Sequence, residues 1–477
     1  MTCRAFCALT LLATPLGAQS AFDRTKPPML PRPAELTVPE VKALSLPNGL
    51  KLNVVEHHEL PLVHVILSVA GGARLDASRP GLATFTANML DEGAGTRSAL
   101  QLQSELAYLG AQLTTAADWD RTTVSLKVPV RTLEPALDLM ADVVLRPTFS
   151  AAEVTRQRGL RLTVILQRKD QPNTLAQLAF STALYSAGHP YYNPTGGDSA
   201  TTVTLDSAKV RAFYEATIRP SRATIYAVGD MSSAQLREAL GKRFGAWRDL
   251  QSAAVVRSNV TPTTLGSGRR IVLVDKPNAA QSVIVIGAPG LERSSPDYAA
   301  VQVMNTILGG LFTSRLNFNL RETKGYTYGA GSRFDFRLAP GPFTASAAVR
   351  TNVTDSSLVE FFKELRKMRD SLVTDAELAK AKASLELGIP DELETTSQIA
   401  GEMAALGVFG LALEEKRDFA RKVRAVTKAA VQRAARQYVP EDRVLITVVG
   451  DLAKVRAGIE ALKLGDVSVL EVGQVVR

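Results

Sequence analysis

Cysteine is nearly absent from this sequence of 477 residues, which contains only Cys3 and Cys7, both within the first ten positions. The rest of the chain therefore has no disulfide framework, no thiolate nucleophile and no Cys-ligated metal. A chain of this length does not need disulfides, because it buries enough surface to fold without them. The absence of cysteine thus excludes disulfide scaffolds and thiol-dependent enzymes.

Histidine is almost as scarce, with four residues in all: His57, His58, His64 and His189. The first two precede Pro61 in a predicted turn, the third lies on the following strand, and the fourth belongs to a His-Pro-Tyr turn. No pair has the four-residue helical spacing that places two imidazoles on one metal, and no G-x-S-x-G motif frames a serine nucleophile. The histidines by themselves predict neither a zinc site nor a hydrolase triad.

Long apolar runs are also missing, since none reaches the roughly 18 residues that a membrane-spanning helix needs. At the N-terminus, Arg4 is followed by a short apolar stretch, residues 5–13, and then by small and helix-breaking residues. This order is typical of a secretory signal peptide. We expect residues 1–20 to be that signal, with cleavage after Ala18 or Ser20, and the mature chain to be exported to the periplasm.

The composition is that of a globular protein, with 45% apolar and 22% charged residues and a net charge of +9. Short basic runs such as Arg366-Lys367 and residues 433–436 lie in helical patterns that also contain acids, alanine and leucine. Such patterns are typical of a solvated helix face and do not indicate a nucleic-acid surface. We expect no nucleic-acid partner.

Two breaks divide the chain. Residues 21–44 are rich in proline and are predicted to form an N-terminal arm. Residues 251–268 are rich in Ser, Thr, Val and Gly, without a helical period, and are predicted to be a linker. They separate an N-terminal half, residues 45–250, from a C-terminal half, residues 269–477.

The two halves repeat each other. Lys51-Leu-Asn-Val-Val-Glu resembles Arg270-Ile-Val-Leu-Val-Asp, and Val130-Arg-Thr recurs as Val349-Arg-Thr at the same offset of 219 residues. A strand ending in Gly-Asp closes each pattern, at Asp230 and Asp451. A nearly constant offset over separated segments indicates two homologous halves.

The order of elements in each half predicts an α+β fold. A strand pair opens each half (50–55 with 62–70; 270–275 with 282–288). A helix follows (81–90; 297–308), then a strand (121–128; 343–349), a long helix (133–145; 356–371), and the closing strand and helix. Because the opening reads as a hairpin, we expect a mixed or mainly antiparallel sheet flanked by helices in each half.

Several longer motifs occur in a fixed order along the chain. They are Leu46-Pro-Asn-Gly-Leu50, the segment 81–90, His189-Pro-Tyr191, Val228-Gly-Asp230 and the segment 314–329. Together they resemble the insulinase/pitrilysin-like zinc metallopeptidases in their short form, which is similar to mitochondrial processing peptidase. The resemblance extends from Ser45 to Leu462 and implies two halves of a clamshell-like fold.

The zinc motif of that family is degenerate here. H-x-x-E-H places two imidazoles on one helix face and a glutamate beside the metal-bound water. The frame 81–90 is intact, but Thr84, Ala87 and Asn88 occupy the working positions. The helix that would supply a third ligand, residues 151–167, has Glu153 as its single acid. The resemblance therefore implies no zinc and no catalytic residue in this chain.

The C-terminal half resembles the family's non-zinc half, which carries an Arg and a Tyr after a Gly-Gly pair. The corresponding residues are Arg321 and Tyr328, and the resemblance implies that they contact substrate. Tyr326 shares the motif but not the register. The alternative is that Arg321 pairs with Glu322 or Asp335 while Tyr328 packs within a strand.

The resemblance implies a non-catalytic, substrate-binding subunit of an exported heterodimeric zinc metallopeptidase that acts on unfolded peptides. The chain would be inactive alone, zinc would reside in a homologous partner chain, and the peptide would be held partly by strand addition to a sheet edge. The alternative is an inactive peptide-binding or structural homologue without a catalytic partner.

Overall fold

A computed structural model describes residues 36–249, 263 and 265–476 of the protein. The predicted signal (1–20) and most of the predicted arm and linker lie outside the described residues. No helix in the described part of the chain is both long and apolar enough to cross a membrane.

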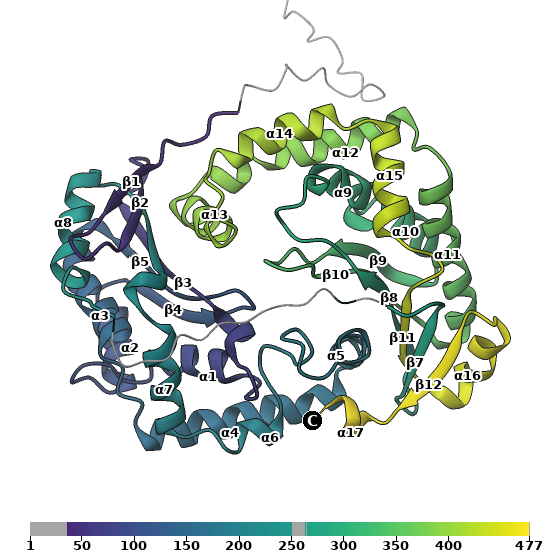
Figure 1. The fold of residues 1–477 in the computed structure, drawn as a ribbon, viewed down its shortest axis with the longest axis horizontal. Helices are drawn as coiled ribbons and strands as arrows, with labels where there is room; N and C mark the ends of the chain where they lie inside the picture. The colour runs from purple at the N-terminus through teal and green to yellow at the C-terminus, as the bar shows by residue number, and fades with distance from the viewer. Residues whose placement is uncertain (1–35, 250–262, 264, 477) are drawn as a thin grey trace, which may run out of the picture. The chain divides into compact units, whose positions relative to one another are not determined.

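The N-terminal half contains a six-stranded mixed sheet with the order β1-β2-β6-β3-β5-β4 (Figure 1). Its strands are β1 (Lys42–Ser45), β2 (Lys51–Glu56), β3 (Leu62–Ala70), β4 (Gln112–Ala117), β5 (Arg121–Pro129) and β6 (Ala223–Gly229). The helices are α1 (Leu82–Asn88), α2 (Ala99–Tyr108), α3 (Leu133–Leu145), α4 (Ala151–Gln167), α5 (Pro172–Leu184), α6 (Ser199–Thr202), α7 (Ser207–Thr217) and α8 (Ser233–Phe244). Only the β2–β6 pair is parallel.

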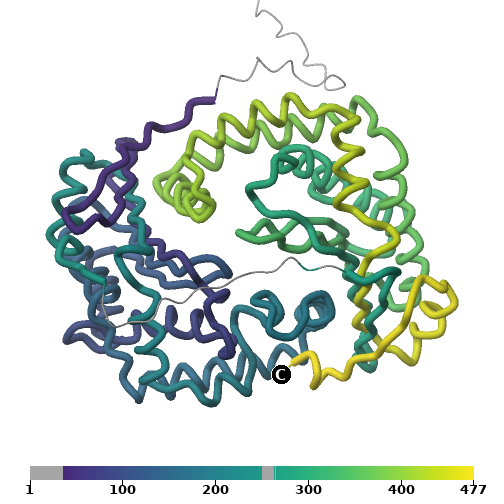
Figure 2. Tube along the Cα trace, viewed as in Figure 1, coloured from purple at the N-terminus to yellow at the C-terminus, as the bar shows by residue number. Residues whose placement is uncertain are grey.

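The C-terminal half repeats this sheet with the order β12-β7-β11-β8-β10-β9. Its strands are β7 (Arg270–Asp275), β8 (Gln281–Pro289), β9 (Thr327–Phe334), β10 (Pro342–Arg350), β11 (Leu445–Gly450) and β12 (Asp466–Leu470). The helices are α9 (Tyr298–Asn305), α10 (Arg315–Asn317), α11 (Thr354–Asp370), α12 (Asp375–Gly388), α13 (Thr396–Val408), α14 (Glu415–Ala425), α15 (Lys428–Tyr438), α16 (Leu452–Ala461) and α17 (Val472–Val475). In Figure 2 the yellow C-terminal trace returns beside β7, where β12 pairs in parallel.

The predicted α+β class with mixed sheets is confirmed, but the predicted opening hairpin is wrong. In the first sheet β6 lies between β2 and β3, and in the second β11 lies between β7 and β8. The connection 57–61 can extend to about 16 Å, which exceeds the two strand spacings of about 4.8 Å that it must cross. The space is filled by a strand from more than 150 residues later in the chain. In addition, β1 begins at Lys42, within the predicted arm, and pairs with β2.

Each half also contributes a helix to the other half's sheet. Helix α5 packs on β8 and β11, where Phe180 lies against Gly287; a Cβ at Gly287 would approach the Phe180 ring to 2.7 Å. Reciprocally, α13 packs on β3 and β6, so that Ile399 and Met403 join a cluster with Ile66. Burial of these apolar faces ties the two halves together.

Candidate functional site

Helix α1 carries the three positions of the degenerate zinc motif. Thr84 is half-buried and donates its hydroxyl hydrogen to the Thr195 carbonyl at 2.7 Å. Ala87 is buried, with 1% of its surface exposed, whereas Asn88 is exposed. The start of α1 is held by Asp76, whose carboxylate accepts hydrogen bonds from the Gly81 and Ala83 amides at 2.7 Å each.

Two cationic side chains from α4 and its C-terminal end also lie near the start of α1. Arg161, from α4, donates to the Gly81 carbonyl at 2.8 Å, and its guanidinium carbon lies 5.0 Å from the centre of the Phe85 ring. Burial, together with the neighbouring charge of Arg168, lowers the pKa of Arg161 to about 10. Arg168 in turn donates to the Gly197 carbonyl at 2.7 Å. The helix expected to carry a carboxylate ligand thus presents guanidinium groups.

This arrangement does not fit the zinc ion that the family fold implies. A hydroxyl already committed to a carbonyl, a methyl group and an amide cannot replace two imidazoles and a general base, and nearby guanidinium groups repel a cation. Among the described residues, no group of three or more His, Cys, Asp or Glu could hold a metal. The histidines lie apart: His58 bonds Asp230 and His64 bonds Ser125, each at 2.7 Å.

We therefore predict that the purified mature chain binds no stoichiometric zinc. Thr84, Ala87 and Asn88 offer no imidazole or carboxylate, and no ligand faces them from α4. Elemental analysis after dialysis against buffer with a trace of zinc checks this, with an active zinc peptidase of the same family processed in parallel as the control. About one zinc per chain, removable by a chelator, would contradict the prediction.

Residues 306–328, here called the Arg/Tyr segment because they include Arg321 and Tyr328, contain two π-helical turns and end on β9, at the edge of the second sheet. The turns are η5 (Thr306–Gly310) and η6 (Phe318–Thr323), and such turns are frequent at functional sites. Gly309 lies against β9, since a Cβ there would come within 2.1 Å of the Ser332 nitrogen. The double glycine therefore lets the first turn pack directly on the strand that carries Tyr328.

The structure separates the two tyrosines of the motif. Tyr328, on edge strand β9, has 90% of its surface exposed and is not packed within the sheet. Tyr326 is partly buried against the second core. Gly325 lies between η6 and the two tyrosines and takes a left-handed conformation with φ of 63°, which turns the chain toward β9.

Arg321 pairs with Glu322, as the alternative predicted, and part of its side chain stays accessible. Its Nε lies 3.4 Å from the Glu322 carboxylate, and its guanidinium carbon lies 4.4 Å from the centre of the Phe312 ring. About a third of the side chain stays exposed. Asp335, the other acid considered, instead pairs with Arg337. A substrate role for Arg321 and Tyr328 stays a prediction.

Two buried asparagines hold this segment in place, and the sequence analysis assigned them no role. Asn317 donates to the Phe312 carbonyl at 2.6 Å and accepts from the Ala330 amide at 3.0 Å, which joins the loop to β9. Asn319 donates to the carboxylates of Glu360 and Glu364 on α11. Asparagine is unfavourable within helical segments, so two of them between apolar residues are a signal of such structural hydrogen bonds.

Two family models match successive parts of the chain, and the second begins within the N-terminal half. Residues 53–195 match the family described as Insulinase (Peptidase family M16), and residues 204–385 match the Peptidase M16 inactive domain. The second range contains both Arg321 and Tyr328.

Similar sequences and structures agree with these matches. An uncharacterised zinc protease of Mycobacterium tuberculosis is 27% identical over 392 residues, covering 81% of this chain and 87% of the relative. A probable mitochondrial-processing peptidase subunit beta of Arabidopsis thaliana is 23% identical over 432 residues, covering 87% and 80%.

Among solved structures, a peptidase M16 inactive domain from Pseudomonas fluorescens has a TM-score of 0.80 and 28% identity, covering 86% of this chain and 98% of the other. A chain of complex III2 from Candida albicans shares the fold with a TM-score of 0.71, 17% identity, and coverage of 88% and 99%. With two models of one family matched in order, over residues 53–195 and 204–385, the chain belongs to the insulinase (M16) peptidase family and carries that family's inactive domain.

Proposed function

We propose that this protein is the non-catalytic, substrate-binding subunit of an exported heterodimeric zinc metallopeptidase that acts on unfolded peptides. The observation that carries the proposal is the contrast between the halves. The position of the family's zinc motif holds Thr84, Ala87 and Asn88 beside an arginine, whereas Arg321 and Tyr328 are accessible.

Exposed aromatic groups near Arg321 support peptide contact. Phe312, Phe318 and Tyr328 expose 65%, 58% and 90% of their surfaces within a stretch of 17 residues. Arginine and aromatic residues are enriched in the central contacts of protein interfaces. Arg321, stacked on Phe312, would bind a substrate carbonyl or carboxylate, and the Tyr328 hydroxyl would donate to the carbonyl on which negative charge develops.

The sheet edges support a second mode of peptide binding. Strands β4 and β9 each end a sheet and have a neighbouring strand on one side only. An extended peptide can add to such an edge through main-chain hydrogen bonds, which do not depend on its sequence. This mode suits unfolded substrates of varied composition.

The partner in this proposal is a homologous chain that carries zinc. The support is the likeness to a relative whose name makes it a subunit of a peptidase. Export of the complex to the periplasm rests on the predicted signal at residues 1–20. The alternative is an inactive peptide-binding or structural homologue. The observation in its support is the fold shared with a chain of complex III2.

Reconstitution separates the two proposals. The chain alone is expected to cleave no peptide, because Thr84, Ala87 and Asn88 supply neither zinc ligands nor a general base, while mixing it with a zinc-bearing homologue should produce chelator-sensitive cleavage. A quenched fluorescent peptide library measures both, with each chain alone as the control. Chelator-sensitive turnover by the lone chain after repurification would exclude the inactive-subunit proposal, and no stimulation by any zinc-bearing homologue from the same genome would favour the alternative.

A further inference from the structure

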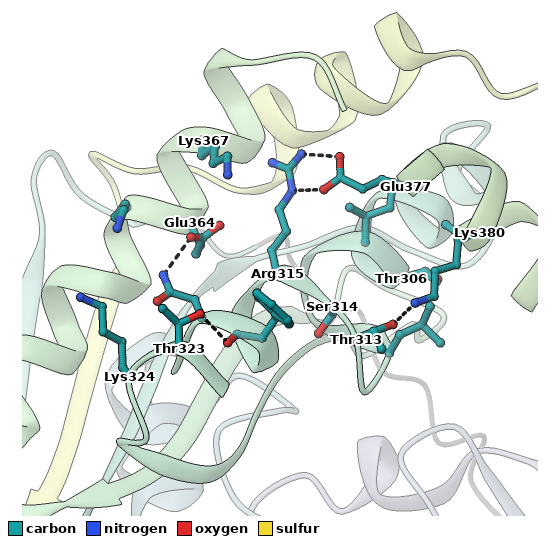
Figure 3. Close-up of a pocket in the computed structure, with 16 residues that line it drawn as sticks. Thr306, Thr313, Ser314, Arg315, Thr323, Lys324, Glu364, Lys367, Glu377 and Lys380 are labelled. Atoms are coloured by element: carbon teal, nitrogen blue, oxygen red, sulfur yellow. Dashed lines mark hydrogen bonds and ion pairs between the residues drawn. The ribbon is translucent and has the colours of Figure 1, made fainter. Parts of the chain in front are cut away.

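A cavity lies beside Arg321 and Tyr328, between α10, the two π-helical turns and helices α11 and α12 (Figure 3). Its volume is about 460 Å³, within the range of pockets that enclose small molecules. Arg321 and Tyr328 do not line it. The cavity therefore excludes the Arg/Tyr pair itself, although it shares Phe318 with the aromatic groups near Arg321.

The lining of the cavity carries an excess of positive charge. Five cationic side chains line it, against two acids, Glu364 and Glu377. Both acids are already engaged: Glu377 accepts two hydrogen bonds from Arg315 at 2.7 and 3.0 Å, and Glu364 accepts one from Asn319 at 2.8 Å.

The cations differ in how far they are neutralised. Lys324 and Lys363 both contact Glu360, at 3.1 Å each. The ammonium group of Lys380 contacts only the Thr313 hydroxyl. The ammonium group of Lys367 has no hydrogen bond or ion pair within the described part of the chain, and both lysines are exposed. Two ammonium groups therefore face the cavity without a carboxylate partner.

Buried donors without partners lie in the same wall. Ser314 is 2% exposed, and its hydroxyl has no hydrogen-bond partner among the described residues. The Arg315 side chain is 9% exposed and its Nη1 is likewise unpaired, because Glu377 takes only Nε and Nη2. Figure 3 shows both contacts to Glu377 on one side of the guanidinium. Buried polar groups normally have partners, so these two donors are available to an acceptor that enters the cavity.

Part of the remaining wall is apolar. Ile307, Leu311, Phe318 and Ala381 line this part, and Phe318 has 58% of its surface exposed. An apolar wall opposite a cluster of donors is the usual composition of a pocket that binds an amphiphilic molecule.

We propose that this cavity binds a small amphiphilic anion, whose carboxylate or phosphate head lies among Ser314, Arg315 and Lys367 and whose apolar body lies against Phe318 and Leu311. The head accepts hydrogen bonds from the hydroxyl and Nη1 that otherwise lack partners, and Lys367 and Lys380 balance its charge. Hydrogen bonds between ionised groups are about twice as strong as neutral ones, so an anion is favoured over a neutral acceptor. The proposal does not depend on the peptidase assignment.

Isothermal titration of the purified chain with octanoate and with octyl phosphate tests the proposal and distinguishes the two heads. Octanol and octylamine supply the same apolar body without the negative charge. The test variants are Lys367→Gln, Lys380→Gln and Ser314→Ala. Lys382→Gln is the matched control, because Lys382 lies on the same helix as Lys380 but donates to the Arg424 carbonyl and does not line the cavity.

We expect at least one anion to bind with a dissociation constant below about 1 mM, and Lys367→Gln to weaken it about tenfold or more, as loss of a hydrogen bond to a charged group predicts. Lys382→Gln should leave the affinity unchanged. Absence of binding by both anions, equal binding of octanol or octylamine, or an equal loss in Lys382→Gln would each overturn the proposal. Circular dichroism spectra of the variants identify any that fail to fold, and Ser314→Ala removes the hydroxyl without touching a charge.

Discussion

Replacing Tyr328 by Phe is expected to lower kcat/KM of the reconstituted heterodimer about 100-fold while leaving folding and pairing intact. The hydroxyl would donate to the scissile carbonyl as negative charge develops there, and loss of one such hydrogen bond costs about 3 kcal/mol in the transition state. The side chain is 90% exposed, so removing its oxygen leaves no buried group without a partner. Steady-state kinetics with a quenched peptide measures the effect.

Arg321→Ala should cause a comparable loss, since Arg321 is expected to orient the same peptide. Tyr326→Phe is the internal control: Tyr326 belongs to the same motif but packs partly against the second core. Analytical ultracentrifugation would test whether each variant still pairs with the zinc-bearing chain. Unchanged kinetics in Tyr328→Phe would reduce the motif to a packing element, and an equal loss in Tyr326→Phe would mean that the wrong tyrosine has been assigned.

Replacing Glu377 by Gln is expected to destabilise the C-terminal half by about 2–3 kcal/mol. The change leaves the guanidinium of Arg315, 9% exposed, without its counter-charge, and removing one partner of a fully buried pair costs about 3–5 kcal/mol. We expect about 2–3 kcal/mol, less than for a fully buried pair, because 30% of the Glu377 side chain is exposed. Glu377 also accepts the Thr374 amide in the capping box of α12, which Gln preserves.

The pH dependence of this loss follows from the pKa of Glu377. Burial raises that pKa, but hydrogen bonds from Arg315 and the Thr374 amide outweigh it and lower the pKa to about 2. A depressed carboxyl pKa contributes stability above its unfolded value of 4.5, and that contribution disappears as the pH falls through the folded value. Urea midpoints of wild type and Glu377→Gln should therefore differ fully above about pH 5 and converge between about pH 4.5 and 2.

Glu238→Gln provides the comparison for this experiment. Glu238 pairs with Lys242 four residues along α8, and both side chains are more than half exposed. Exposed pairs contribute little to stability, so the urea midpoint should not change. A Glu377→Gln protein that unfolds at the wild-type midpoint at pH 7 would show that the Arg315 pair is not stabilising.

The local pattern of apolar and polar residues was sufficient to predict most individual helices and strands. The predicted helix 133–145 coincides with α3, because apolar side chains spaced by three and four residues specify one buried helix face. The internal repeat likewise predicted two similar sheets, which the matching strand orders confirm. Strand pairing could not be predicted from local sequence. Strand β6 lies between β2 and β3, and no local signal indicates that these two strands pair with a strand so much later in the chain.

The basic run Arg366-Lys367 shows the same limit on a smaller scale. Its composition predicted a solvated helix face, and Arg366 does pair with Glu441 at the surface. Lys367 is exposed as well, but adjacent residues on a helix are about 100° apart, so it faces a different neighbour and lines the cavity beside Arg315. Only the packing of α11 against α10 and α12 creates that environment.

The sequence alone determined the family resemblance, the two-half repeat and the absence of metal-binding side chains at 84, 87 and 88, because residue identity decides which atoms can bind a metal. Tertiary structure decided the rest: which tyrosine is exposed, the exchange of α5 and α13 between the sheets, and the cavity with its unpaired donors. These features depend on contacts between segments far apart in the chain. Burial and hydrogen-bond partners are properties of those contacts and not of any residue by itself.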